Sequence, residues 1–173
     1  WNFSSSSILG TTRASGSQPP SKALSSSESA WSTTALAAIT SAQLAARPVM
    51  RAGEVLETVP GLVVSQHSGE GKANQYYLRG FNIDHGTDLA ISVAGMPINL
   101  PTHGHGQGYA DMNFLIPELV SGIQYQKGTY SADSGDFSAA GSVRVNYLNV
   151  LDNPMVRVEG GGFGYGRVLA AAS

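Results

Sequence analysis

Asp88–Gly108 reads DLAISVAGMPINLPTHGHGQG, and this segment joins a hairpin pattern to a loop of histidines and glycines. Apolar residues stand at every second position before a turn at residues 94–97 and resume after it: Leu89, Ile91, Val93, then Ile98 and Leu100. A period of two is typical of a strand with one buried face. The first half of the segment therefore predicts a β-hairpin that packs one face against a core.

The second half of the segment predicts a binding loop. Its three glycines, within Thr102–Gly108, free the backbone, and the side chains between them carry donors and acceptors. A dipeptide of the same chemistry, Asp84-His85, precedes the hairpin. We expect the ligand-contacting residues to be His103, His105 and Gln107, with His85 and Asp84 as further members.

Two interpretations of these histidines stay open. On an extended segment the spacing of His103 and His105 puts both imidazoles on one face, and imidazole is a common ligand of Zn, Cu, Ni and Fe. Alternatively, the loop is a polar surface that touches water or a neighbouring wall. Because the spacing fixes no third ligand, we expect ligand contact without a metal, and we expect no cofactor.

Composition limits the class of protein. A length of 173 residues suits one domain of ordinary size. The formal net charge of −2, with ten Lys and Arg in total, provides no basic field for nucleic acid. The absence of cysteine excludes disulfides and thiolate metal sites. Charged residues make up 13% of the chain, about half the usual ~25%.

The pattern along the chain divides it into three parts. Residues 1–46 predict a mobile Ser-rich leader followed by a weak helix at residues 32–46, which ends before Pro48. Residues 47–149 predict the core domain, and residues 150–173 predict a separate hairpin that begins something larger. Because the chain starts at Trp1 and stops inside a strand pattern, we expect a piece of a longer protein.

The core domain predicts an α+β fold, a small mixed β-sheet with short helices. Its expected helices cover residues 51–58 and a short turn at 116–120. Its expected strands, in addition to the hairpin, cover residues 62–66, 75–79, 123–127 and 141–147. After residue 149 a strict alternation at 155–159, a Gly-rich aromatic turn and a return strand at 167–172 predict one further hairpin.

Five motifs between roughly Arg47 and Tyr147 resemble the plug domain of TonB-dependent outer-membrane receptors. They stand in the family's order: Gly53–Leu62, Leu78–Phe81, the hairpin Leu89–Pro97, Ile123–Gly128 and the Gly-rich return Ser134–Val143. The segment after Asn153 resembles the start of the transmembrane β-barrel that encloses such a plug. The resemblance thus implies a plug followed by the first hairpin of a truncated barrel.

The resemblance also implies a function and its partners. It implies a gate that contacts cargo, a siderophore, metal complex or similar scarce nutrient, in the bacterial cell outer membrane. The implied partners are the chain's own barrel and a TonB-type energising protein on the periplasmic side, although residues 1–46 show no recognisable TonB box. An enzyme is not expected, because no nucleophile-elbow pattern such as G-x-S-x-G occurs. The alternative is a free-standing extracytoplasmic ligand- or metal-binding module with the plug fold.

Overall fold

A computed structural model describes residues 36–66 and 71–173. The chain divides into a unit Trp1–Trp31 and a unit Ser32–Ser173, and the described residues all belong to the second. The predicted Ser-rich leader lies outside the described residues.

The predicted hairpin lies in the largest sheet. Strand β5 (Leu89–Val93) turns back into β6 (Met96–Pro97) through Ala94 and Gly95, whose φ angles of +50° and +81° suit a two-residue hairpin turn. On its other side β5 pairs in parallel with β8 (Gly141–Tyr147). Because β5 has sheet neighbours on both sides and buries Leu89, Ile91 and Val93, it holds the loop beyond β6 on a rigid base.

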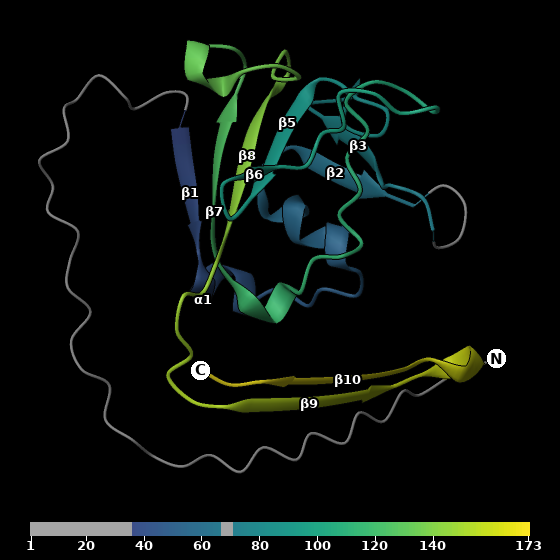
Figure 1. Cartoon of the computed structure of the whole chain (residues 1–173), viewed down its shortest axis with the longest axis vertical. Helices are drawn as coiled ribbons and strands as arrows, with labels where there is room; N and C mark the ends of the chain where they lie inside the picture. The colour runs from purple at the N-terminus through teal and green to yellow at the C-terminus, as the bar shows by residue number, and fades with distance from the viewer. Residues whose placement is uncertain (1–35, 67–70) are drawn as a thin grey trace, which may run out of the picture. The chain divides into compact units, whose positions relative to one another are not determined.

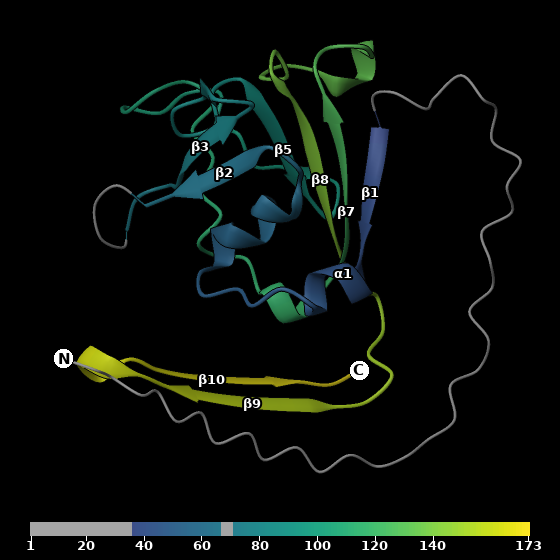
Figure 2. The ribbon, with the colours of Figure 1, turned by 180° about the vertical axis from the view of Figure 1, so that it is seen from behind.

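Two more antiparallel strands complete this sheet. The sheet has the order β1-β7-β8-β5-β6, with β1 at Leu36–Thr40 and β7 at Val120–Lys127. Figure 1 shows β1, β7, β8 and β5 side by side, and Figure 2 shows the same sheet from behind. A second sheet of three strands comprises β2 (Leu62–Ser65), β3 (Gln75–Leu78) and β4 (Phe81–Asn82).

The third sheet contains only the last two strands. Strands β9 (Met155–Gly160) and β10 (Gly166–Ala171) pair with each other in antiparallel register. They coincide with the hairpin expected after residue 149.

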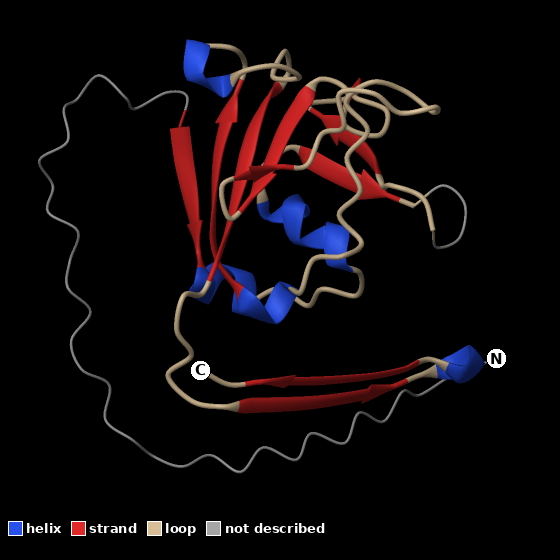
Figure 3. Ribbon diagram, in the orientation of Figure 1, coloured by secondary structure: helices blue, strands red, loops and turns tan. Residues whose placement is uncertain are grey.

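Within residues 36–66 and 71–173 the helices are few and short, as Figure 3 shows. They are α1 (Ser41–Ala45) and the 3₁₀ helices η1 (Ala52–Thr58), η2 (Pro117–Leu119), η3 (Ala132–Ser134) and η4 (Gly162–Gly164). The buried core lies between η1 and the two larger sheets, and its largest fully buried side chains include Tyr76, Leu56, Ile83, Leu89, Ile91, Met112 and Ile123. This arrangement of small mixed sheets and short helices is the predicted α+β fold.

The weak helix expected at residues 32–46 is only partly correct. Residues Leu36–Thr40 form strand β1 along β7, and the helix is limited to Ser41–Ala45. Thr40 caps that helix, because its hydroxyl accepts a hydrogen bond from the Gln43 amide while the Gln43 side-chain oxygen accepts one from the Thr40 amide. Pairing with β7 overrides the helical preference of the alanines, which is a weak local term. The predicted helix at 51–58 is present, as the 3₁₀ helix η1.

No helix in the part of the chain that the structure describes has both the length and the apolar character needed to cross a membrane.

Candidate functional site

His85 is a buried histidine at the base of the predicted loop. Its Nδ1 lies 3.0 Å from the carbonyl oxygen of Ala73 and 3.1 Å from that of Asn74. Carbonyl oxygens only accept, so Nδ1 carries the proton and donates it. This contact fixes the ring orientation and leaves Nε2 as the nitrogen on the other side of the ring.

The loop that carries His103 and His105 is closed at its base by backbone hydrogen bonds. The amide of Leu100 donates to the carbonyl of Tyr109 at 2.9 Å, and the amide of Gly108 donates to the carbonyl of Leu100 at 2.8 Å. Residues 101–108 therefore form a closed excursion from the end of the hairpin. The excursion is exposed along most of its length.

Asn99 ties this closed base to the turn that contains His85. Its side chain is buried, its Oδ1 accepts from the amide of Ile91 at 2.7 Å, and its Nδ2 lies 2.9 Å from three carbonyl oxygens, those of Gly86, Leu89 and Gly108. One amide side chain thus joins the strand, the His85 turn and the end of the loop. Asn99 is a positioning residue for the histidines.

Aromatic contacts bring three of the predicted residues and Tyr109 into one cluster. The rings of His85 and His105 meet edge to face, with centroids 4.6 Å apart. The ring of His103 stacks on Tyr109 at 4.0 Å. The Tyr109 hydroxyl accepts from the amide of Ala73 at 2.7 Å. The Tyr109 ring, which contacts the histidines, is therefore fixed to the loop that also holds His85.

Asp84 joins this cluster from the neighbouring position. Its Oδ1 lies 3.7 Å from Nε2 of His85, and its φ of +55° places it in the left-handed region that Asp tolerates better than most residues. Asp84, His85 and His105 each offer one ligand atom, and these three atoms lie within 4.8 Å of one another. A buried imidazole, an exposed imidazole and an exposed carboxylate thus converge.

The structure differs from the predicted site in the positions of His103 and His105 and in the role of Gln107. The segment around His103 and His105 bends instead of extending, and the two rings contact different neighbours, Tyr109 and His85. The expectation that both imidazoles share one face of a strand is therefore wrong. Gln107 is held through its backbone, because its carbonyl accepts from the Thr87 hydroxyl at 3.0 Å, while its side chain is exposed.

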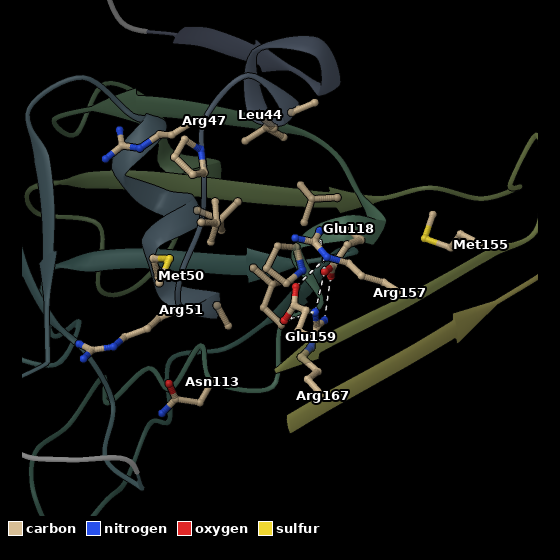
Figure 4. Close-up of a pocket in the computed structure, with 18 of the residues that line it drawn as sticks. Leu44, Arg47, Met50, Arg51, Asn113, Glu118, Met155, Arg157, Glu159 and Arg167 are labelled. Carbon is tan, nitrogen blue, oxygen red and sulfur yellow. Dashed lines mark hydrogen bonds and ion pairs between the residues drawn. The ribbon is translucent and has the colours of Figure 1, made fainter. Parts of the chain in front are cut away.

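A second polar cluster joins η2 to the last hairpin. Figure 4 shows Arg157 and Arg167 directed toward Glu118, with Glu159 beside them. Two nitrogens of Arg167 lie 2.6 and 2.8 Å from the two carboxylate oxygens of Glu118, a bidentate pair, and Arg157 lies 3.1 Å from the same carboxylate. These groups line one side of a cavity of about 1170 Å³, which Leu44, Arg47, Met50 and Arg51 line elsewhere.

The charge of Glu118 depends on this pair. The hydrogen bond from Arg167 lowers the pKa of Glu118 below its ordinary value of 4.5, against an opposing effect of partial burial. A carboxyl whose pKa is lower in the folded than in the unfolded chain stabilises the fold above the unfolded-state pKa. That contribution disappears as the pH falls through the folded-state pKa.

We therefore expect Glu118→Gln to remove a pH-dependent part of the stability. At neutral pH the variant should unfold at lower urea concentration than the unmodified chain, and the difference should shrink as the pH is lowered below 4.5. Urea unfolding of both chains at a series of pH values measures this. A difference that stays constant across the series would show that the Glu118 charge does not contribute.

Asn99, Tyr109 and Glu118 were not predicted in these roles. A signal exists for the Glu118 partners, because the strict alternation at 155–159 places Arg157 and Glu159 on one strand face. No local signal marks Asn99, whose four partners lie in other segments.

Comparison with known families shows to which family the chain belongs. Residues 28–142 match the model of the TonB-dependent Receptor Plug Domain, which covers more than half of the chain. The chain belongs to the TonB-dependent receptor plug family. The matched residues include Asp84, His85, His103 and His105, as well as strand β1 and Glu118. The match confirms the resemblance that the five sequence motifs indicated.

Solved structures show the same fold. The siderophore receptor PirA from Acinetobacter baumannii matches with 23% identity and a TM-score of 0.53 over 72% of this chain and 19% of that one. The ferric enterobactin receptor PfeA from Pseudomonas aeruginosa matches with 22% identity and a TM-score of 0.51 over 69% of this chain and 18% of that one. The plug domain described here thus spans about a fifth of the length of these receptors.

Proposed function

We propose that this plug domain is the gate of an outer-membrane receptor whose barrel begins at β9. The observation that carries the proposal is the two-faced hairpin that follows the plug. Its polar face presents Arg157 and Arg167 to Glu118 of the plug. Its other face is apolar and exposed: Val156, Val158 and Val168 are 75%, 73% and 73% accessible.

Such alternation suits a transmembrane β-strand. Strands of outer-membrane barrels turn apolar side chains to the lipid and polar side chains inward, and Phe163 and Tyr165 at the turn fit the aromatic girdle of such a barrel. A plug inside the barrel contacts the polar face. The exposed valines, uncovered in water, would be an aggregation hazard, and lipid removes that hazard.

The proposed activity is energised uptake of a siderophore, metal complex or similar scarce nutrient. The histidine cluster supports the cargo-contacting role, because it is a partly exposed group of donors, acceptors and aromatic rings on a loop that the sheet holds rigidly. A TonB-type energising protein on the periplasmic side is the proposed partner, and the bacterial outer membrane the proposed location. Receptors of this family are not enzymes, and uptake needs no catalytic group in the plug.

Deletion of the gene in the bacterium that encodes it tests the function. We expect the deletion strain to grow more slowly when iron or another transition metal is supplied only as a complex, and a plasmid copy to restore growth. Restoration should fail in a strain that lacks the energising protein. Normal growth of the deletion strain on every complex tried would contradict uptake, and restoration without the energising protein would favour the free-standing binding module.

A further inference from the structure

The histidine cluster has the composition of a transition-metal site. It supplies two imidazole nitrogens and one carboxylate oxygen, from His85, His105 and Asp84, with the ligand atoms within 4.8 Å of one another. Tetrahedral bonds of about 2.0–2.2 Å to one ion place the ligand atoms about 3.3–3.6 Å apart, so the farthest atoms of the set must come about 1 Å closer together. Asp84 and His105 are exposed, and rotation of their side chains can supply that movement.

The buried member of the set is already oriented. The carbonyls of Ala73 and Asn74 hold Nδ1–H of His85, and Nε2 is the ring nitrogen on the side where Asp84 lies, 3.7 Å away. In metal-binding histidines the N–H of the second ring nitrogen characteristically donates a hydrogen bond to a backbone carbonyl or a carboxylate in this way. The rigid His85 and two adaptable exposed ligands form a half-organised site.

The supports of the set are separate from its ligands. Asn99 holds the carbonyls of Gly86 and Gly108, which flank the two histidine segments. Tyr109 lies beneath both, with its ring centroid 5.4 Å from that of His85 and 5.8 Å from that of His105. These contacts fix the segments that carry the three ligands next to one another, so the ligands are held together by more than loop proximity.

We propose that Asp84, His85 and His105 bind a divalent transition-metal ion directly, with Zn²⁺, Ni²⁺ and Cu²⁺ as the fitting class. Imidazole and carboxylate ligands together suit these ions, whereas Mg²⁺ and Ca²⁺ require oxygen ligands in larger number. Three protein ligands leave an open position for a group on the cargo. This metal site rests on the proposed function, because it specifies the chemistry of the cargo-contacting histidine cluster. It replaces the expectation of ligand contact without a metal.

Calorimetric titration of the untagged 173-residue chain with Zn²⁺ alone tests the site. We expect saturable binding of one ion per chain, with no comparable heat from Mg²⁺. His105→Ala removes an exposed ligand and should weaken Zn²⁺ binding by more than about 10-fold, since loss even of an outer partner costs at least that much. Asp84→Asn, which keeps the left-handed backbone, should weaken binding in the same direction.

His103→Asn is the matched control. It removes the ring from the same loop but keeps a side-chain oxygen that can accept from the His105 amide, as Nδ1 of His103 does at 3.1 Å. His103 stacks on Tyr109 and lies outside the converging set. Zn²⁺ binding should change by less than about 3-fold, well under the cost of losing a supporting partner. Circular dichroism of each variant confirms folding.

Three results would overturn the metal site: no saturable Zn²⁺ binding, unchanged binding by His105→Ala, or equal losses from His103→Asn and His105→Ala. Failure of the site is distinguishable from failure of the proposed function. A chain that binds no Zn²⁺ but whose gene supports growth on a complexed nutrient refutes only the site. A chain that binds Zn²⁺ as expected but whose deletion affects no uptake refutes only the receptor function.

Discussion

Replacement of Asn99 by leucine is expected to lower the free energy of unfolding by about 4 kcal/mol, because at least two buried groups lose their partners at about 1–3 kcal/mol each. The amide of Ile91 donates to the Oδ1 of this side chain, and the carbonyls of Leu89 and Gly108 accept from its Nδ2, whereas the Gly86 carbonyl also accepts from the Leu89 amide. Leucine fills a similar volume but offers neither a donor nor an acceptor. Urea unfolding followed by circular dichroism measures the loss.

Asn113→Leu is the control for this substitution. Asn113 is exposed, and its side-chain amide donates to the Lys72 carbonyl at 2.9 Å. Because water can replace that bond, its loss should cost no more than about 1 kcal/mol. Equal effects at Asn99 and Asn113 would show that Asn99 does not hold the histidine loop.

Replacement of Gly86 by alanine is the second change with a large expected effect. Gly86 follows His85 directly and has a φ of +112°, which side chains with a Cβ rarely adopt. A Cβ there would lie 2.8 Å from the Cβ of Ala110 and 3.2 Å from the carbonyl oxygen of Gly108. Backbone strain of about 1–2 kcal/mol and overpacking of about 1–3 kcal/mol add to an expected loss of about 3 kcal/mol.

Gly104→Ala makes the same chemical change where the structure leaves room. Gly104 lies in the exposed loop between the two histidines, and a Cβ at that position meets nothing within 4 Å. Its stability should change by less than about 1 kcal/mol, and stabilisation is possible because alanine restricts the unfolded chain. Chemical unfolding of the two variants side by side decides the matter. A loss at Gly104 equal to that at Gly86 would contradict the close packing around the His85 turn.

Sequence patterns predicted the strands well where side chains alternate between a buried and an open face. The hairpin at 89–97 and the last two strands follow the period of two closely enough to be placed within a residue or two. The stretch Leu36–Thr40 failed, since a run of alanines carries no alternation and its partner β7 lies more than 80 residues away. Only the long-range pairing decides its structure.

The sequence predicts which residues belong to the candidate site but not how they contact one another. Histidines between glycines mark a loop with binding chemistry, but their neighbours depend on how that loop bends. The pairing of His105 with His85 rather than with His103 follows from the closure at Leu100 and Tyr109 and from the Asn99 bonds. These are contacts between segments, and a linear pattern does not contain them.

The domain boundaries at 46/47 and 149/150 remain predictions. The family match begins at residue 28, and β1 belongs to the same sheet as β7 and β8. These observations favour a plug that begins before β1. Glu118 shows that the plug and the hairpin share charged contacts across the second boundary.

The genomic sequence downstream of the Ser173 codon, in the same reading frame, tests the receptor assignment most directly. The proposed function predicts that the frame continues through many alternating strands of about 9–11 residues, apolar on one face and polar on the other, in a number that can close a barrel. A stop codon directly after Ser173, together with a secretory signal upstream, would contradict it. In that case no barrel would exist for the plug to close, and the free-standing binding module would account for the chain.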